Sequence, residues 1–145
     1  MEGRVDLVLQ VGKWLIVTEW KSYRIPFLDV PVGGRKNASN FAKAATLYNY
    51  NLADILQLGW NDKEQFKGGT LGSWIMGKEA GQLRGYVTGP TVKQLLEERR
   101  LELRAHLVII VGSRHILLWD MDEMGNLAAE PRLVEMPSRL IRQDG

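Results

Sequence analysis

The chain has 145 residues, of which 45% are hydrophobic and 25% are charged, the composition of an ordinary globular protein with one domain over residues 1–145. It contains no cysteine and only two histidines, which excludes a disulfide framework and a thiolate or histidine-rich zinc site. No apolar stretch reaches the roughly 18 residues of a spanning helix, and no signal-peptide pattern is present. We therefore expect a soluble cytoplasmic protein with no membrane partner.

The net charge is +2 and the isoelectric point is about 9.0. A balance of this size permits binding to nucleic acid without requiring it.

The first predicted element is a β-hairpin over residues 3–22, GRVDLVLQVGKWLIVTEWKS. Gly12-Lys13 is typical of a two-residue turn, because glycine supplies the positive φ of its first central position. Residues whose numbers sum to 25 then face each other across the two strands, so Asp6 is expected to lie opposite Glu19. Strand alternation places Lys21 on the same face. Directly opposed like charges are destabilising, so this pair needs compensation.

A lysine and a divalent cation would supply that compensation. Carboxylate oxygens without histidine or cysteine favour Mg²⁺ or Mn²⁺. A lysine beside such a site can orient a water or stabilise charge on phosphorus. Asp6, Glu19 and Lys21 are thus the minimum set of groups for phosphodiester hydrolysis. A surface ion pair between Glu19 and Lys21 on a half-exposed sheet is the alternative interpretation.

The burial expected for the hairpin favours the site. Leu15 and Val17 share the Glu19 face, whereas the opposite face is also apolar, with Leu7, Leu9, Val11, Trp14, Ile16 and Trp20. A sheet that is apolar on both faces is expected to be covered on both. The charges would then lie at the opening of a cleft.

The same residues resemble the D…ExK signature of the PD-(D/E)XK nuclease superfamily. The pattern D-L-V-x4-G-K-x2-I-V-x-E-x-K is similar to archaeal Holliday-junction resolvases, and GRVD is similar to RecB-like and NucS-type nucleases. A weaker similarity to NucS-type domains covers residues 83–104. The resemblance implies a restriction-endonuclease-like mixed sheet flanked by helices, and a metal-dependent DNA endonuclease. Many members are homodimers, which leaves a homodimer open here.

Carried over to this chain, the resemblance makes Asp6 and Glu19 metal ligands, the main-chain carbonyl of Trp20 a further ligand, and Lys21 the catalytic lysine. Two features depart from the family pattern. The helix that usually precedes the aspartate strand, often with another acid, has no counterpart in residues 1–5. The Q-x3-Y element of RecB-like members has a counterpart in Gln82 and Tyr86 only where we predict a strand.

The remaining elements follow in chain order. Residues 22–36 read as a long loop, in which Tyr23, Arg24, Arg35 and Lys36 could contact DNA phosphates or be solvated charges. A helix is predicted over residues 37–58, capped by Asn37 or Ser39 and ended by Gly59. The glycine-rich residues 59–82 read as a family-specific insertion of unpredictable structure.

A short strand is predicted over residues 84–88 and a helix over 91–103, where Glu97 or Glu98 could supply the missing acid or simply be solvated. A second apolar hairpin turns at about Gly112-Ser113. An all-β sandwich is the alternative class, disfavoured by the helical patterns.

Three functions are consistent with the sequence: a Mg²⁺-dependent deoxyribonuclease acting on DNA, with junction or branched substrates suggested by the resemblance; a nuclease-fold subunit that binds nucleic acid without cutting; and a protein-interaction module in which the motif arises by chance.

Overall fold

A computed structural model describes residues 7–35, 38–60 and 69–135, and it shows a mixed α/β domain. Five strands form one sheet in the order β1-β2-β5-β6-β7, with β1 Leu7–Val11, β2 Trp14–Tyr23, β5 Glu102–Val111, β6 His115–Met121 and β7 Arg132–Glu135. Only β2 and β5 pair in parallel; the other neighbours are antiparallel. The predicted α/β class and mixed sheet are confirmed.

All the helices that the structure describes lie in the connection from β2 to β5. They are the 3₁₀ turn η1 Ile25–Phe27, α1 Asn40–Leu47, α2 Leu52–Leu56, α3 Leu71–Trp74, the π-helical turn η2 Ile75–Glu79, α4 Ala80–Val87 and α5 Pro90–Arg99. A two-stranded sheet, β3 Leu28–Asp29 with β4 Gly59–Trp60, lies within the same connection. Parallel strands need a long crossover of this kind.

The register of the first hairpin agrees with the prediction. Leu7 pairs with Thr18, Leu9 with Ile16 and Val11 with Trp14, so paired numbers sum to 25, and Gly12 has a φ of +59°. The predicted position of Asp6 opposite Glu19 lies outside the described residues. The second hairpin, β5–β6, turns at residues 112–114, as predicted, and Gly112 has a φ of +68°.

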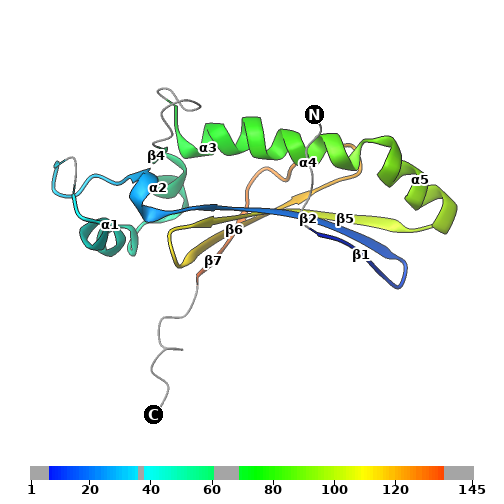
Figure 1. Ribbon diagram of the computed structural model, residues 1–145, viewed down its shortest axis with the longest axis horizontal. Helices are drawn as coiled ribbons and strands as arrows, with labels where there is room; N and C mark the ends of the chain where they lie inside the picture. The colour runs from blue at the N-terminus through cyan, green and yellow to red at the C-terminus, as the bar shows by residue number, and fades with distance from the viewer. Residues whose placement is uncertain (1–6, 36–37, 61–68, 136–145) are drawn as a thin grey trace, which may run out of the picture.

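One face of the large sheet is covered and the other is open. The long helical run α3-η2-α4, continued by α5, lies along one side of the sheet (Figure 1). Buried side chains of β2, β5 and β6 alternate with less buried ones, and the fully buried ones include Val17, Leu107 and Leu117. This alternation is expected of a sheet with a single covered face.

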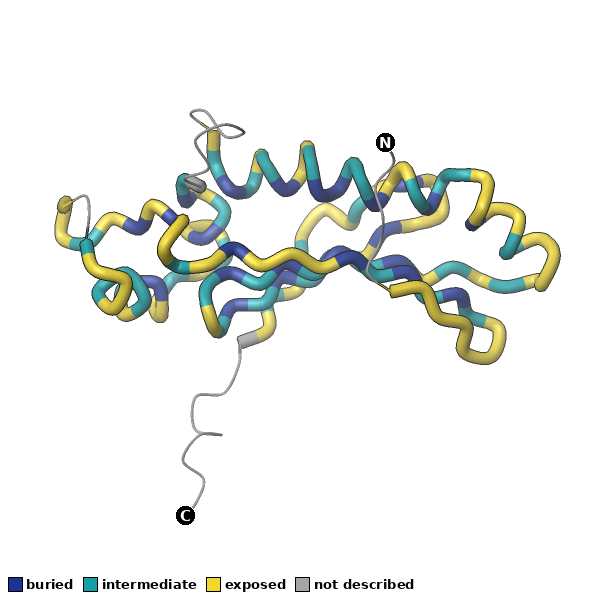
Figure 2. Tube along the Cα trace, viewed as in Figure 1, coloured by how far each residue is buried: buried dark blue, intermediate teal, exposed yellow. Residues whose placement is uncertain are grey.

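The prediction that both faces of the hairpin are covered is therefore wrong. Strand β1 is exposed along its whole length (Figure 2). Leu9, Val11 and Trp20, on the face away from the helices, are 46%, 49% and 46% exposed. The apolar sequence of this face predicted a cover that the described chain does not provide.

Three helix boundaries also differ from the predictions. The single helix expected over 37–58 is two helices: Ser39 caps α1 by accepting from the Ala42 amide, and an Asn51–Asp54 capping box starts α2. Gly59 lies in β4 rather than at a helix end. The helix predicted to reach residue 103 ends at Arg99, because Arg100 adopts the left-handed conformation.

The strand predicted over residues 84–88 does not form, because Arg84 to Val87 are the end of α4. The preceding residues, for which the sequence predicted a family-specific insertion without a definite structure, are largely helical from Leu71 onward. No helix in the described part of the chain combines the length and apolar character needed to span a bilayer.

Candidate functional site

Glu19, Lys21 and Tyr23 lie along β2 on the face that the helices cover, because side chains two apart in a strand share a face. Glu19 is 5% exposed and Tyr23 is fully buried, whereas Lys21 between them is exposed. The covered face therefore opens to solvent beside the buried carboxylate.

The helical run opposite β2 contributes a second buried carboxylate. Beside the small Ala80, its buried side chains recur at every fourth position, Leu71, Ile75, Glu79, Leu83 and Val87. Four of these five are aliphatic; the central one is Glu79, which is 1% exposed. Glu79 is absent from the residues predicted from the sequence, although this strict spacing could have identified its helix face.

The π-helical turn explains how every fourth residue can face the sheet over so long a run. In an α-helix with 3.6 residues per turn, each step of four residues rotates about 40° past a full turn, so such a stripe drifts around the helix. The wider turn at Ile75–Glu79 holds more residues and offsets this drift. Glu79 is the last residue of that turn and is directed at the sheet.

Tyr23 links the two elements. Its hydroxyl donates a hydrogen bond of 2.6 Å to Glu79 Oε2, and the Trp74 side chain hydrogen-bonds to the same phenol. Burial raises the pKa of Tyr23 far above that of an ordinary tyrosine, and the Glu79 carboxylate raises it further, with a contribution from Glu19. Both carboxylates thus act electrostatically on one buried hydroxyl.

This shift predicts a pH-dependent stability. Because the folded-state pKa of Tyr23 is raised above 10.0, its contribution is complete below that pH and is lost as the pH rises above it. We expect the urea midpoint of the wild-type chain to fall more steeply between about pH 9 and pH 11 than that of Tyr23→Phe. Parallel slopes for the two proteins would show that Tyr23 ionises as readily in the folded as in the unfolded chain.

Of the other predicted metal-site residues, Trp20 lies in β2 with its side chain on the uncovered face, so only its main chain can serve the site. Asp6 lies outside the described residues. Within the described part of the chain, no group of three or more histidine, aspartate or glutamate side chains is arranged to hold a metal. Glu19 and Glu79 are the acids that the described residues contribute to the covered face.

The residues predicted to contact nucleic acid are dispersed. Tyr23 ends β2 instead of lying in the following loop, and its buried side chain cannot reach a phosphate in this conformation. Arg24 and Arg35 are exposed, and Lys36 lies outside the described residues.

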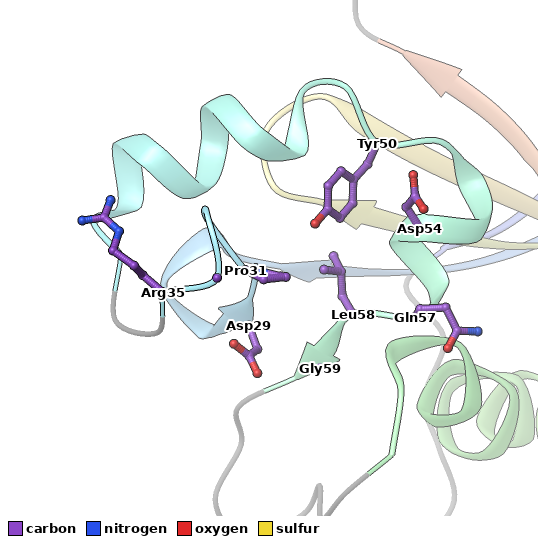
Figure 3. Close-up of a pocket in the computed structure, with 9 residues that line it drawn as sticks. Asp29, Pro31, Arg35, Tyr50, Asp54, Gln57, Leu58 and Gly59 are labelled. Carbon is purple, nitrogen blue, oxygen red and sulfur yellow. The ribbon is translucent and has the colours of Figure 1, made fainter.

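Arg35 lies at one side of a surface hollow of about 530 Å³, which is lined by Asp29, Pro31, Gly34, Arg35, Tyr50, Asp54, Gln57, Leu58 and Gly59. Figure 3 shows its guanidinium directed away from Tyr50 and Asp54. The hollow has two carboxylates and one cation among these residues, and neither Glu19 nor Lys21 lines it. It is a separate feature from the carboxylates of the covered face.

The change from strand to helix in α4 alters the interpretation of the Q-x3-Y element. Gln82 and Tyr86 are four apart on one helix, so they share a side of it, and both are partly buried. Glu97 and Glu98, considered as sources of the missing acid, are exposed on α5. Glu79, three residues before Gln82, is the acid that the helical run directs at β2.

Comparisons of the chain with models of protein families, with curated proteins and with solved structures find no match.

Proposed function

We propose that the chain is a divalent-cation-dependent phosphodiesterase that cleaves DNA. The observation that carries the proposal is the position of Glu19, a buried carboxylate on the covered face of β2, with the exposed Lys21 two residues further along that face. Buried charges in proteins are paired or bind metals. In metal-assisted hydrolysis a carboxylate can hold the cation while a nearby cationic side chain stabilises charge that develops on the phosphate.

The donor set fits a hard cation. Glu19 offers carboxylate oxygens, and Asp6, which the sequence pairs with Glu19, would offer two more. Oxygen donors without histidine or cysteine suit Mg²⁺ or Mn²⁺, which often keep several water ligands. A bound cation would supply charge stabilisation at the phosphorus and an acidified water.

The chain's own residues would divide the remaining work. Glu19, Asp6 and the Trp20 carbonyl would hold the cation. The Lys21 ammonium can donate hydrogen bonds to a non-bridging phosphate oxygen and stabilise the charge that grows there during attack. Arg24, Arg35 and Lys36 would hold the DNA backbone near the site through phosphate contacts. The resemblance to junction resolvases suggests branched DNA as a substrate.

The test is cleavage of supercoiled plasmid and of a synthetic four-way junction, with Mg²⁺, with Mn²⁺ and with EDTA. We expect cleavage with either cation and none with EDTA. Salt-dependent retardation of DNA in a gel without cleavage would support the subunit that binds but does not cut, because phosphate contacts weaken steeply with salt. If the chain neither cleaves nor retards DNA, the protein-interaction module is the remaining function.

A further inference from the structure

The uncovered face of the large sheet is a continuous apolar surface. Even-numbered residues of β2, β5 and β6 point away from the helices, and odd-numbered residues of β1 share that face because directly paired side chains do so. The apolar residues of this face, here called the open face, are Leu7, Leu9, Val11, Trp14, Ile16, Trp20, Val108, Ile110, Ile116, Leu118 and Val134. They come from all five strands, so they form one surface.

The open face is large enough for a specific interface. Strands spaced about 4.8 Å apart and rising about 3.3 Å per residue give a sheet with these strand lengths an area of roughly 600 Å² in projection. Specific interfaces bury about 1,200–2,000 Å² in total over the two partners. Two open faces in contact therefore reach this range, whereas monomers rarely expose apolar patches larger than a few hundred Å².

The charges on and beside the open face are matched within the chain. Asp120 accepts a hydrogen bond of 3.0 Å from Arg132, and the same oxygen lies 3.1 Å from Nδ1 of His106. At the hairpin turn, the Glu102 carboxylate lies 3.5 Å from the Lys13 ammonium. The face therefore carries both signs of charge at its margin and has no strong net charge.

This pattern distinguishes between classes of partner. Arg104 adds one further cation, and its guanidinium lies 4.1 Å from the centre of the Trp14 ring. Nucleic acids and anionic membranes are bound by many cations acting together, and the open face has few of them around an aliphatic centre. Homodimer interfaces have an apolar core, a polar rim, and an excess of aromatic and arginine side chains. The open face has this composition.

We propose that the open face is the interface of a homodimer, in which the sheets of two copies pack face to face. Packed sheets lie about 10 Å apart with their side chains interdigitated, so one sheet face suits another in shape. A two-fold axis brings the same patch of both copies together, which requires a surface without strong net charge. The helices would lie on the outside of the dimer. The inference concerns the face opposite Glu19 and does not depend on the proposed function.

Sedimentation velocity of the full chain over a concentration series tests the dimer directly. Interfaces of standard size have dissociation constants from the micromolar range downward, so we expect dimers at a protein concentration of about 100 μM. A wild-type chain that stays monomeric at that concentration overturns the proposal, and the open face would then belong to a different partner.

Leu9→Lys and Val134→Lys place a charge in the open face near opposite edges of the sheet. The two side chains are 46% and 48% exposed in the single chain, so both variants should fold, which circular dichroism verifies. Each dimer contains the new ammonium twice, against apolar side chains, and its dissociation constant should rise at least about tenfold in each single variant and about a hundredfold in the double variant. Phe41→Lys, at an 84% exposed position on α1, is the matched control and should dimerise like the wild type.

Val134→Lys also separates the open face from the edge of the sheet. Strand β1 has one neighbour in the described sheet, so two copies could instead associate by pairing their β1 strands edge to edge. Such a dimer would be unaffected by Val134→Lys, because Val134 lies on β7 at the other edge. A folded Val134→Lys that dimerises as strongly as the wild type therefore overturns the assignment of the interface to the open face.

Discussion

Glu19→Gln should abolish DNA cleavage while leaving the fold intact. The amide replaces a carboxylate of nearly the same shape at a position that is 5% exposed, so the packing around β2 changes little. The amide is a weaker ligand for a hard cation than the carboxylate. The measurement is cleavage of plasmid and junction DNA at millimolar Mg²⁺ and Mn²⁺, with circular dichroism to verify the fold.

The metal-free stability of Glu19→Gln distinguishes the two interpretations of this carboxylate. If Asp6 opposes Glu19 as the sequence predicts, the substitution removes one of two like charges and should raise the free energy of unfolding by about 0.2–1 kcal/mol. If Glu19 instead serves a structural ion pair with Lys21, stability should fall and cleavage should persist.

Magnesium provides the third comparison for the same variant. A ligand that binds only the folded state stabilises it by mass action, by roughly 2.7 kcal/mol at a hundred times its dissociation constant. Millimolar Mg²⁺ should therefore raise the melting temperature of the wild type and do so much less in Glu19→Gln. An equal shift in both proteins, or cleavage by the variant, would remove Glu19 from the site.

The part of the site that could be predicted from the sequence is the part governed by local rules. Gly12-Lys13 determines a turn, the turn determines the register, and strand alternation then places Glu19 and Lys21 on one face. None of these steps depends on a distant contact. The same local rules place the β5–β6 turn next to Gly112.

Glu79 was missed because glycines weaken the local helix signal of the segment that carries it, although the every-fourth-residue spacing was present in the sequence. Four glycines, Gly72, Gly77, Gly81 and Gly85, lie in the run from α3 to α4, and each lowers helix propensity by about 1 kcal/mol relative to alanine. A Cβ at Gly77, Gly81 or Gly85 would meet no atom within 4 Å, so these three are not required by packing. Burial against the sheet, a tertiary effect, stabilises this helix.

On the uncovered face of the sheet, the sequence predicted burial that the structure does not show. Leu7, Leu9 and Trp20 have the pattern of a buried face, yet they are 38%, 46% and 46% exposed. An apolar periodicity indicates that a face is suited to burial, but it does not identify the element or partner that covers the face. The covered face was distinguishable only by its carboxylates and lysine.

Lys21→Met should reduce the turnover number for cleavage by about a hundredfold to a thousandfold without weakening cation binding. Methionine keeps the unbranched apolar stem of lysine and removes the ammonium, and Lys21 is exposed, so folding should be unaffected. If the ammonium stabilises charge that develops on the phosphate in the transition state, its loss lowers kcat more than it raises KM.

The Mg²⁺-induced rise in melting temperature should be the same in Lys21→Met as in the wild type, because an ammonium is not a metal ligand. Glu19→Gln should lose both cleavage and this rise. The two variants therefore distinguish a residue that binds the cation, Glu19, from one that acts on the phosphate, Lys21.

Lys93→Met, at an exposed lysine on α5, is the matched control and should cleave normally. Lys21→Arg keeps the charge and should retain part of the activity. A raised KM with unchanged kcat in Lys21→Met would make Lys21 a DNA-binding cation, because only groups that act more strongly in the transition state than in the ground state change kcat.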